Sequence, residues 1–257
     1  MHAAAPFRRL ILWLATCQLL LLASAHAVAG GDDPYPEFTA RYEVRLNGIK
    51  AGIATFNLVH EQANQYLYKS ESTTTGVASL FGPDKATEYS RWRFVDSQVQ
   101  PVEYRSRRDD GDDDDNVHLF FHWDTMQVEN RGAGEHWNIA MPEGTLDEMV
   151  MQLAMLFELR EGKRVFKYPV AVRGRIKGYH FEVLGEDTTQ LEFGTYATIK
   201  LERKDDDRDK SWVWSAPELN YFPVRFLKKK KSGLKTDILL HELQFKPATP
   251  VAAPTSR

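Results

Sequence analysis

The chain has 257 residues, of which 42% are hydrophobic and 27% charged, and its formal net charge is −3. This composition is typical of a globular protein and excludes a disordered or collagen-like chain. The nearly balanced charge argues against a nucleic-acid-binding protein, which is usually clearly basic. The single cysteine excludes an internal disulfide framework and a multi-cysteine zinc site.

Residues 1–27 have the pattern of a secretory signal peptide. The basic pair Arg8-Arg9 precedes an apolar stretch over residues 10–23, and Ala25-His26-Ala27 fits the small-x-small rule for cleavage. An alternative cleavage point lies two residues later. An uncleaved membrane anchor is the competing interpretation, but the apolar stretch is shorter than the roughly 18–20 residues that span a bilayer.

Cleavage after Ala27 would leave a mature chain without cysteine, because Cys17 lies inside the predicted signal. Such a chain suits an oxidising compartment. No later apolar run is long enough to span a bilayer. We predict three parts in the remaining chain: a flexible N-terminus over residues 28–36, a single β-rich domain over residues 37–246, and a disordered tail over residues 247–257.

The first predicted element is a β-hairpin. Apolar and polar residues alternate strictly over residues 38–46, which predicts a half-buried strand. Asn47-Gly48 follows, and this pair is preferred in the two-residue type I′ turn. The chain then returns through a second alternating segment over residues 53–58.

Further short alternating segments predict strands along most of the domain. They cover residues 66–74, 88–95, 102–108, 117–123, 126–130, 136–141, 165–172, 179–184, 190–193, 196–203, 211–215, 221–227 and 234–243. Strands that follow one another without intervening helices favour a mainly antiparallel sheet. We expect a mainly β fold, a strongly curved antiparallel sheet or an open or spiral barrel, because both limit exposed edges.

One main amphipathic helix is predicted over residues 146–159, packed against this sheet. Thr145 and Glu148 have the spacing of a capping box, and Gly162 is placed to end the helix. Apolar residues then recur at helical spacing on one face. They are Leu146, Met149, Val150, Leu153 and Phe157.

Two charged runs are candidate binding sites. Six aspartates between Asp109 and Asp115 could attract Ca²⁺, but the run lacks the alternating ligands and the distal Glu of a calcium loop. A solvated turn is the simpler interpretation. Lys228–Lys231 precedes Ser232-Gly233 and also predicts a hairpin tip, which could pair with the acidic run or contact lipid head groups.

Metal and catalytic signatures are weak in this sequence. His118 and His122 face the same side of a predicted strand and could join His136 around a metal, but no carboxylate stands at a diagnostic spacing. The chain has no G-x-S-x-G, H-E-x-x-H or phosphate-binding glycine loop. We therefore predict no metal site, no cofactor and no catalytic residue. A hydrolase whose triad assembles in space, for example around Ser79, is an alternative.

Methionines concentrate around the predicted helix at positions 141, 149, 151 and 155. Methionine is adaptable and common at apolar surfaces that accept varied partners. One interpretation is a helix that plugs or gates an apolar cavity in the curved sheet, and the other is gap-filling in an ordinary core. The candidate ligand contacts are Met149, Val150, Leu153 and Phe157.

The last third carries a series of motifs: a strand ending in Lys200-Leu201-Glu202-Arg203, a tryptophan strand, and an aromatic-Pro-Val-Arg turn. Its motif residues are Trp212, Trp214, Pro217, Tyr221, Pro223 and Arg225. Together with the Asn47-Gly48 hairpin, this series resembles the domain-of-unknown-function family 3108 of exported bacterial proteins. The motif itself favours a structural role, in which Pro217 ends a strand and Arg225 pairs with Glu202.

The resemblance implies a periplasmic location in a Gram-negative cell and a likeness to helix-plugged periplasmic lipoprotein carriers. We therefore expect a non-enzymatic protein of the cell envelope that binds a lipid or another apolar ligand between sheet and helix. The alternatives are a scaffold that binds an envelope protein through a sheet edge or the charged hairpin tips, and the hydrolase named above. Nucleic acid is not an expected partner, and the sequence predicts no oligomeric state.

Overall fold

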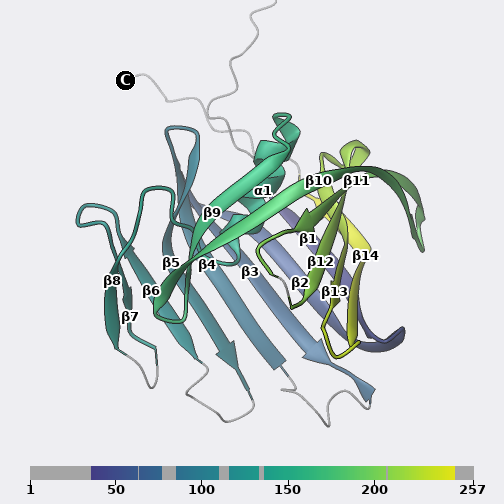
Figure 1. Ribbon diagram of the computed structural model, residues 1–257, viewed down its shortest axis with the longest axis horizontal. Coiled ribbons are helices and arrows are strands. Elements are labelled where there is room, and N and C mark those ends of the chain that lie inside the picture. The colour runs from purple at the N-terminus through teal and green to yellow at the C-terminus, as the bar shows by residue number, and fades with distance from the viewer. Residues whose placement is uncertain are drawn as a thin grey trace, which may run out of the picture. The chain divides into compact units, whose positions relative to one another are not determined.

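The chain folds into one antiparallel sheet of fourteen strands and a helix, α1 (Val150–Arg160). The strands are β1 Phe38–Leu46, β2 Ile49–Gln62, β3 Gln65–Thr74, β4 Lys85–Val95, β5 Gln98–Arg108, β6 Val117–His122, β7 Gln127–Asn130, β8 Trp137–Ala140, β9 Val165–Val172, β10 Arg175–Leu191, β11 Gly194–Arg203, β12 Lys210–Ala216, β13 Phe222–Lys229 and β14 Lys235–Phe245. Figure 1 shows these elements in a computed structural model. The fold is therefore mainly β, as predicted.

The structure describes residues 36–62, 64–76, 85–109, 116–132, 136–206 and 208–246. The chain divides into residues 1–33 and residues 34–257, and every described residue belongs to the second part. Several predictions lie outside the described residues. They concern the signal peptide, the flexible N-terminus up to residue 35, the tail, Ser79 and the acidic run after Asp109.

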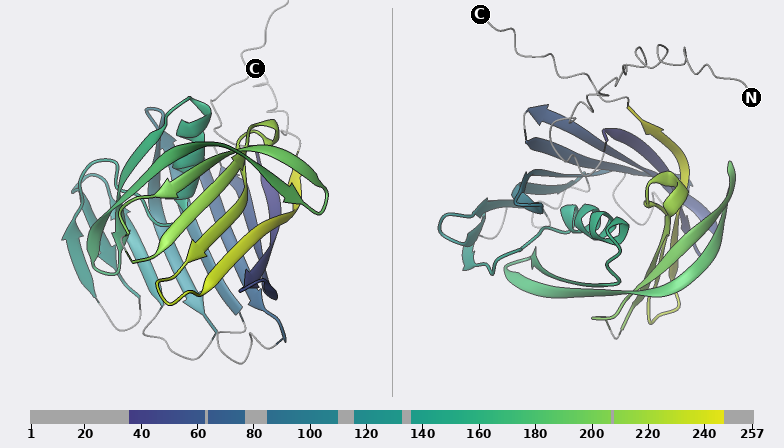
Figure 2. Two further views of the ribbon diagram at one scale, coloured as in Figure 1. Left: turned by 45° about the vertical axis from the view of Figure 1, so that its right-hand side comes forward. Right: turned by 90° about the horizontal axis from the view of Figure 1, so that it is seen from above.

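The two edge strands of the sheet come from the middle of the sequence. The strand order runs β8-β7-β6-β5-β4-β3-β2-β1-β14-β13-β12-β11-β10-β9, so the first and last strands pair at the centre and the edges are β8 and β9. The connection between these two edges carries α1. The sheet curves around the helix, which lies on its concave side (Figure 2).

The crossover also touches the β9 edge directly. Leu146 forms a parallel bridge with Val170. Its N–H donates to the carbonyl of Pro169 and its carbonyl accepts from the N–H of Ala171, each at 2.9 Å. Part of the β9 edge is therefore covered by its own chain, which limits edge-to-edge pairing.

The predicted opening hairpin is confirmed. Leu46 pairs with Ile49, which leaves a two-residue turn. Asn47 and Gly48 have φ angles of 49° and 86°, the left-handed values that a type I′ turn requires at both positions.

Two predicted strands are one in the structure. Strand β10 runs unbroken from Arg175 to Leu191, with a register shift between Val183 and Gly185. Its polar middle pairs fully with β11, and the buried hydroxyls of Thr189 and Thr198 lie 3.2 Å apart. The polar residues between the two predicted strands suggested a break. Hydrophobic periodicity does not show whether a polar residue finds a hydrogen-bond partner in a neighbouring strand.

The predicted start of the helix is wrong. α1 begins at Val150, since the backbone at Leu146 is committed to β9. Thr145 instead donates its hydroxyl proton to the Pro142 carbonyl at 2.7 Å. The Asp147 carboxylate takes the capping role and accepts from the N–H groups of Met149 and Val150 at 2.8 and 2.9 Å.

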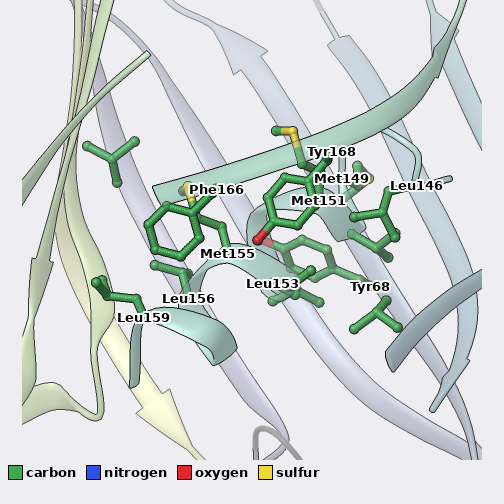
Figure 3. Packing of buried hydrophobic residues seen from close by; sticks show 14 of the residues in the cluster. Tyr68, Leu146, Met149, Met151, Leu153, Met155, Leu156, Leu159, Phe166 and Tyr168 are labelled. Carbon is green, nitrogen blue, oxygen red and sulfur yellow. The ribbon is translucent and has the colours of Figure 1, made fainter. Parts of the chain in front are cut away.

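The helix packs against the sheet as predicted, and its predicted apolar face is buried, but α1 is buried on almost all its other sides as well. Its buried residues are Val150, Met151, Leu153, Ala154, Met155, Leu156 and Leu159. In Figure 3, Phe166 and Tyr168 of β9 lie on one side of the helix and Tyr68 of β3 lies beside Leu153. A helix that is apolar all round belongs inside a core, and here the curved sheet supplies that core.

Candidate functional site

A cavity of about 400 Å³ lies between α1 and strands β2 and β10–β14. Its wall is mainly apolar. The lining residues are Ala54, Phe56, Glu148, Met151, Gln152, Met155, Tyr179, Phe181, Arg203, Ser211, Trp212, Val213, Phe226, Leu227, Lys228, Thr236 and Ile238. Small-molecule sites commonly enclose about 300–1,000 Å³ with mostly apolar walls and a few placed polar groups, so this cavity has the size and character of one.

The helix presents a different side to this cavity from the one predicted. Met151 and Met155 line it, whereas Met149, Val150 and Leu153 are packed in the core with exposures of 2%, 0% and 3%. Because α1 is enclosed, its periodicity could not show which side borders empty space. The methionine cluster was the signal that could have indicated Met151 and Met155.

Phe157, the fourth predicted contact, lies near the C-terminal end of α1. Its ring packs edge-on against Phe94, with the centroids 5.5 Å apart. It borders a second cavity, of about 220 Å³, together with Ser97 and Tyr168. The contact of all four predicted residues with a ligand stays a prediction.

A hydrogen-bonded polar group forms one wall of the larger cavity. The Tyr179 hydroxyl donates to Glu148 Oε1 at 2.6 Å, and the Arg203 guanidinium lies 3.9 Å from the centre of the Tyr179 ring. Arg203 also donates twice to Asp205, at 2.9 and 2.6 Å. Burial and the Glu148 carboxylate raise the pKa of Tyr179, so its hydroxyl stays protonated as a donor.

Behind this wall, Asp147 anchors α1 to the sheet. Its Oδ2 accepts from the Ser90 hydroxyl of β4 at 2.6 Å, while its Oδ1 caps the helix. Complete burial raises the pKa of Asp147 to about 7. Burial, and then the Glu148 charge, also raise the pKa of Glu88. The sequence pattern predicted neither the Asp147–Ser90 contact nor the polar group around Tyr179, because the residues that meet in them are far apart in the chain.

The motif residues of the last third form a scaffold around Trp214. The Trp214 indole N–H donates to Asp187 at 2.8 Å, and the Arg225 guanidinium lies 4.9 Å from the centre of its ring. Arg225 donates twice to Asp237, at 2.8 and 2.7 Å. The predicted Arg225–Glu202 pair is wrong, because the register sets Arg225 opposite Leu239, two residues from Asp237, whereas Glu202 pairs with Lys204.

The remaining motif residues shape chain turns. Ala216 ends β12, as predicted, and Pro217 begins a short 3-10 turn. Tyr221 has a φ of 59°, and its carbonyl accepts from the Ser215 hydroxyl. The carbonyl of Pro223 accepts from the Tyr42 hydroxyl at 2.7 Å, which joins the first strand to β13. Trp212 lies under Lys200, whose Nζ is 5.9 Å from its ring centre.

The histidines of β6 have separate partners. His118 Nε2 lies 2.6 Å from Glu103 and His122 Nε2 lies 3.1 Å from Glu129. Within the described ranges, no three His, Cys, Asp or Glu side chains gather closely enough to hold a metal ion. The described helices include none with the length and apolar character needed to cross a membrane.

Two solved structures show a distant similarity to this chain. One is a β-barrel-like protein of domain of unknown function DUF1849 from Brucella abortus, with TM-score 0.46, 10% identity and coverage of 82% of this chain and 98% of that chain. Another is a putative outer membrane lipoprotein-sorting protein domain from Vibrio parahaemolyticus, with TM-score 0.25, 9% identity and coverage of 83% and 87%.

No curated protein matches the chain. The model of one protein family matches residues 41–238, which is most of the sequence and includes the hairpin, the helix and the tryptophan strand. The match confirms the resemblance found from the motifs: the chain belongs to the family described as "Protein of unknown function (DUF3108)".

Proposed function

We propose that this protein is a non-enzymatic component of the bacterial cell envelope that holds the acyl chain of a lipid between α1 and the sheet. The observation that carries the proposal is the mainly apolar cavity of about 400 Å³ lined by Met151 and Met155. An acyl chain in it would gain about 0.8 kcal/mol for each buried CH₂. Roughly ten methylenes would contribute about 8 kcal/mol before the costs of association.

The walls of the cavity support an amphiphile rather than a purely apolar ligand. Methionine side chains adapt to chains of different shape. Tyr179 and Arg203 lie in the same wall. The Tyr179 hydroxyl donates to Glu148, and the Arg203 guanidinium donates to Asp205. A polar end of the ligand would therefore meet an ordered group of donors and acceptors.

The sequence supports an exported location for this function. The predicted signal peptide would carry the chain out of the cytoplasm, and the mature part would contain no cysteine to oxidise. We therefore place the protein in the periplasm, with a lipid of the envelope as its ligand.

The test is native mass spectrometry of the protein purified from cells, followed by solvent extraction and identification of any bound lipid. We expect a reproducible added mass that extraction removes. Ala54→Leu extends a side chain into the cavity, and displacement of about two methylenes should lower the ratio of lipid-bound to free protein about tenfold.

Ala197→Leu is the matched control, because it makes the same change at an exposed position of β11. It should bind as the wild type does. The absence of any bound mass from the wild type, or equal binding by both variants, would contradict the proposal.

A further inference from the structure

Five lysines gather at one end of the sheet, and we call them the basic rim: Lys210, Lys229, Lys230, Lys231 and Lys235. The register sets Lys229 of β13 directly opposite Lys210 of β12 and directly opposite Lys235 of β14. The other two follow in the turn after β13. All five are exposed, and none forms an ion pair with a carboxylate that the structure describes.

This arrangement is unfavourable for the isolated fold. Like charges directly opposite each other on neighbouring strands repel and destabilise the sheet. The adjacent Lys228 forms an ion pair with Asp209, whose Oδ2 lies 3.1 Å from the lysine Nζ. The rim lysines form no such ion pair with a described carboxylate, so an anion outside the chain would reduce the repulsion between them.

An exposed apolar side chain lies beside the rim. The turn after β1 is joined to the start of β14, because the Asn47 N–H donates to the Lys235 carbonyl and the Lys235 N–H donates to Asn47 Oδ1, each at 2.9 Å. Ile49 follows this turn and is 68% exposed. An apolar residue amid lysines is the pattern of a surface that meets a membrane interface.

Three rim lysines, Lys210, Lys229 and Lys235, are next in sequence to residues of the cavity wall. Ser211, Lys228 and Thr236 line the cavity wall, and each is the sequence neighbour of a rim lysine.

We propose that the basic rim docks this end of the cavity on anionic lipid head groups, with Ile49 entering the interface. The inference rests on the proposed function, since it gives a lipid-binding cavity its route to a bilayer. Each lysine near an anionic membrane surface makes its own contribution to the attraction. A soluble acidic protein would pair with the lysines equally well. It would not, however, offer an apolar phase that both Ile49 and the cavity could contact.

The test is sedimentation of the purified protein with vesicles of phosphatidylglycerol and phosphatidylcholine in equal parts. We expect binding to these vesicles, weakening with added salt, and no binding to phosphatidylcholine alone. The variant K229Q/K230Q/K231Q should raise the Kd about 100-fold. The control K163Q/K167Q/K246Q removes the same formal charge at lysines outside the basic rim and should keep the wild-type Kd.

Other outcomes overturn the docking proposal: equal loss of binding in both variants, equal binding to both vesicles, or binding of polyglutamate where anionic vesicles fail to bind. Native mass spectrometry of the rim variant separates the two proposals. A rim variant that retains its lipid but not the vesicles supports docking and leaves the cavity function intact. Vesicle binding by a wild type that carries no lipid would contradict only the cavity function.

Discussion

At the scale of single residues, Asp147 connects the stability of the protein to pH. Its carboxyl is buried and its pKa in the folded state is about 7, against 3.8 for an ordinary aspartate. A folded-state pKa above the unfolded value makes the folded protein bind more protons, so stability falls as pH rises through the folded pKa. We expect the free energy of unfolding to fall by about 3 kcal/mol between pH 5 and pH 8.

Asp147→Asn should flatten this dependence, because the amide keeps an oxygen for the N–H groups of Met149 and Val150 and has no titrating proton. Urea unfolding at several pH values measures the effect. Glu88 has a raised pKa too, so a smaller slope of the same sign should persist. A variant as steep as the wild type would show that Asp147 is not the group responsible.

The Arg225 pair tests a second residue-scale feature. Arg225→Lys keeps the positive charge but loses the two parallel hydrogen bonds to Asp237 and the stacking on Trp214. Because both partners are partly exposed, we expect a loss of about 1 kcal/mol in the free energy of unfolding. Adding Asp237→Asn to this variant should cost little more, and fully additive losses would argue against coupling.

At the scale of elements, α1 has one side in the packed core and another on the cavity. Leu153→Ala should lower the free energy of unfolding by about 3 kcal/mol, since neighbours cannot fill the space that it leaves. Met151→Ala should cost less than half as much, because this side chain already borders an empty volume. Denaturant titration of both variants measures the two losses of unfolding free energy. A larger loss in Met151→Ala than in Leu153→Ala would contradict the placement of Leu153 in the core and Met151 on the cavity.

At the scale of the whole molecule, the pairing of β1 with β14 unites the two halves of the sheet. Removal of residues 230–257 deletes β14 and leaves the long edges of β1 and β13 unpaired, and exposed edges promote aggregation. We expect this truncated chain to be insoluble or unfolded by circular dichroism. Removal of residues 247–257 alone should leave the melting temperature unchanged, and an equal effect of both deletions would contradict the central role of β14.

Much of this protein is determined locally and could be predicted from its sequence. Alternation gave most strand positions, because a half-buried strand needs an apolar residue at every second position. Asn47-Gly48 gave the first turn, because few residues adopt left-handed angles cheaply. The motifs from Lys200 to Arg225 gave the family.

Only the tertiary structure decided which strands pair and where the cavity lies. The capping role of Asp147, the partner of Arg225 and the side of α1 that borders the cavity depend on residues far apart in the chain. Hydrophobic periodicity reports whether a position is buried, but not what lies opposite it. The sequence alone therefore specified a curved sheet with one helix, and long-range pairing decided that Met151, Met155 and Tyr179 share a cavity.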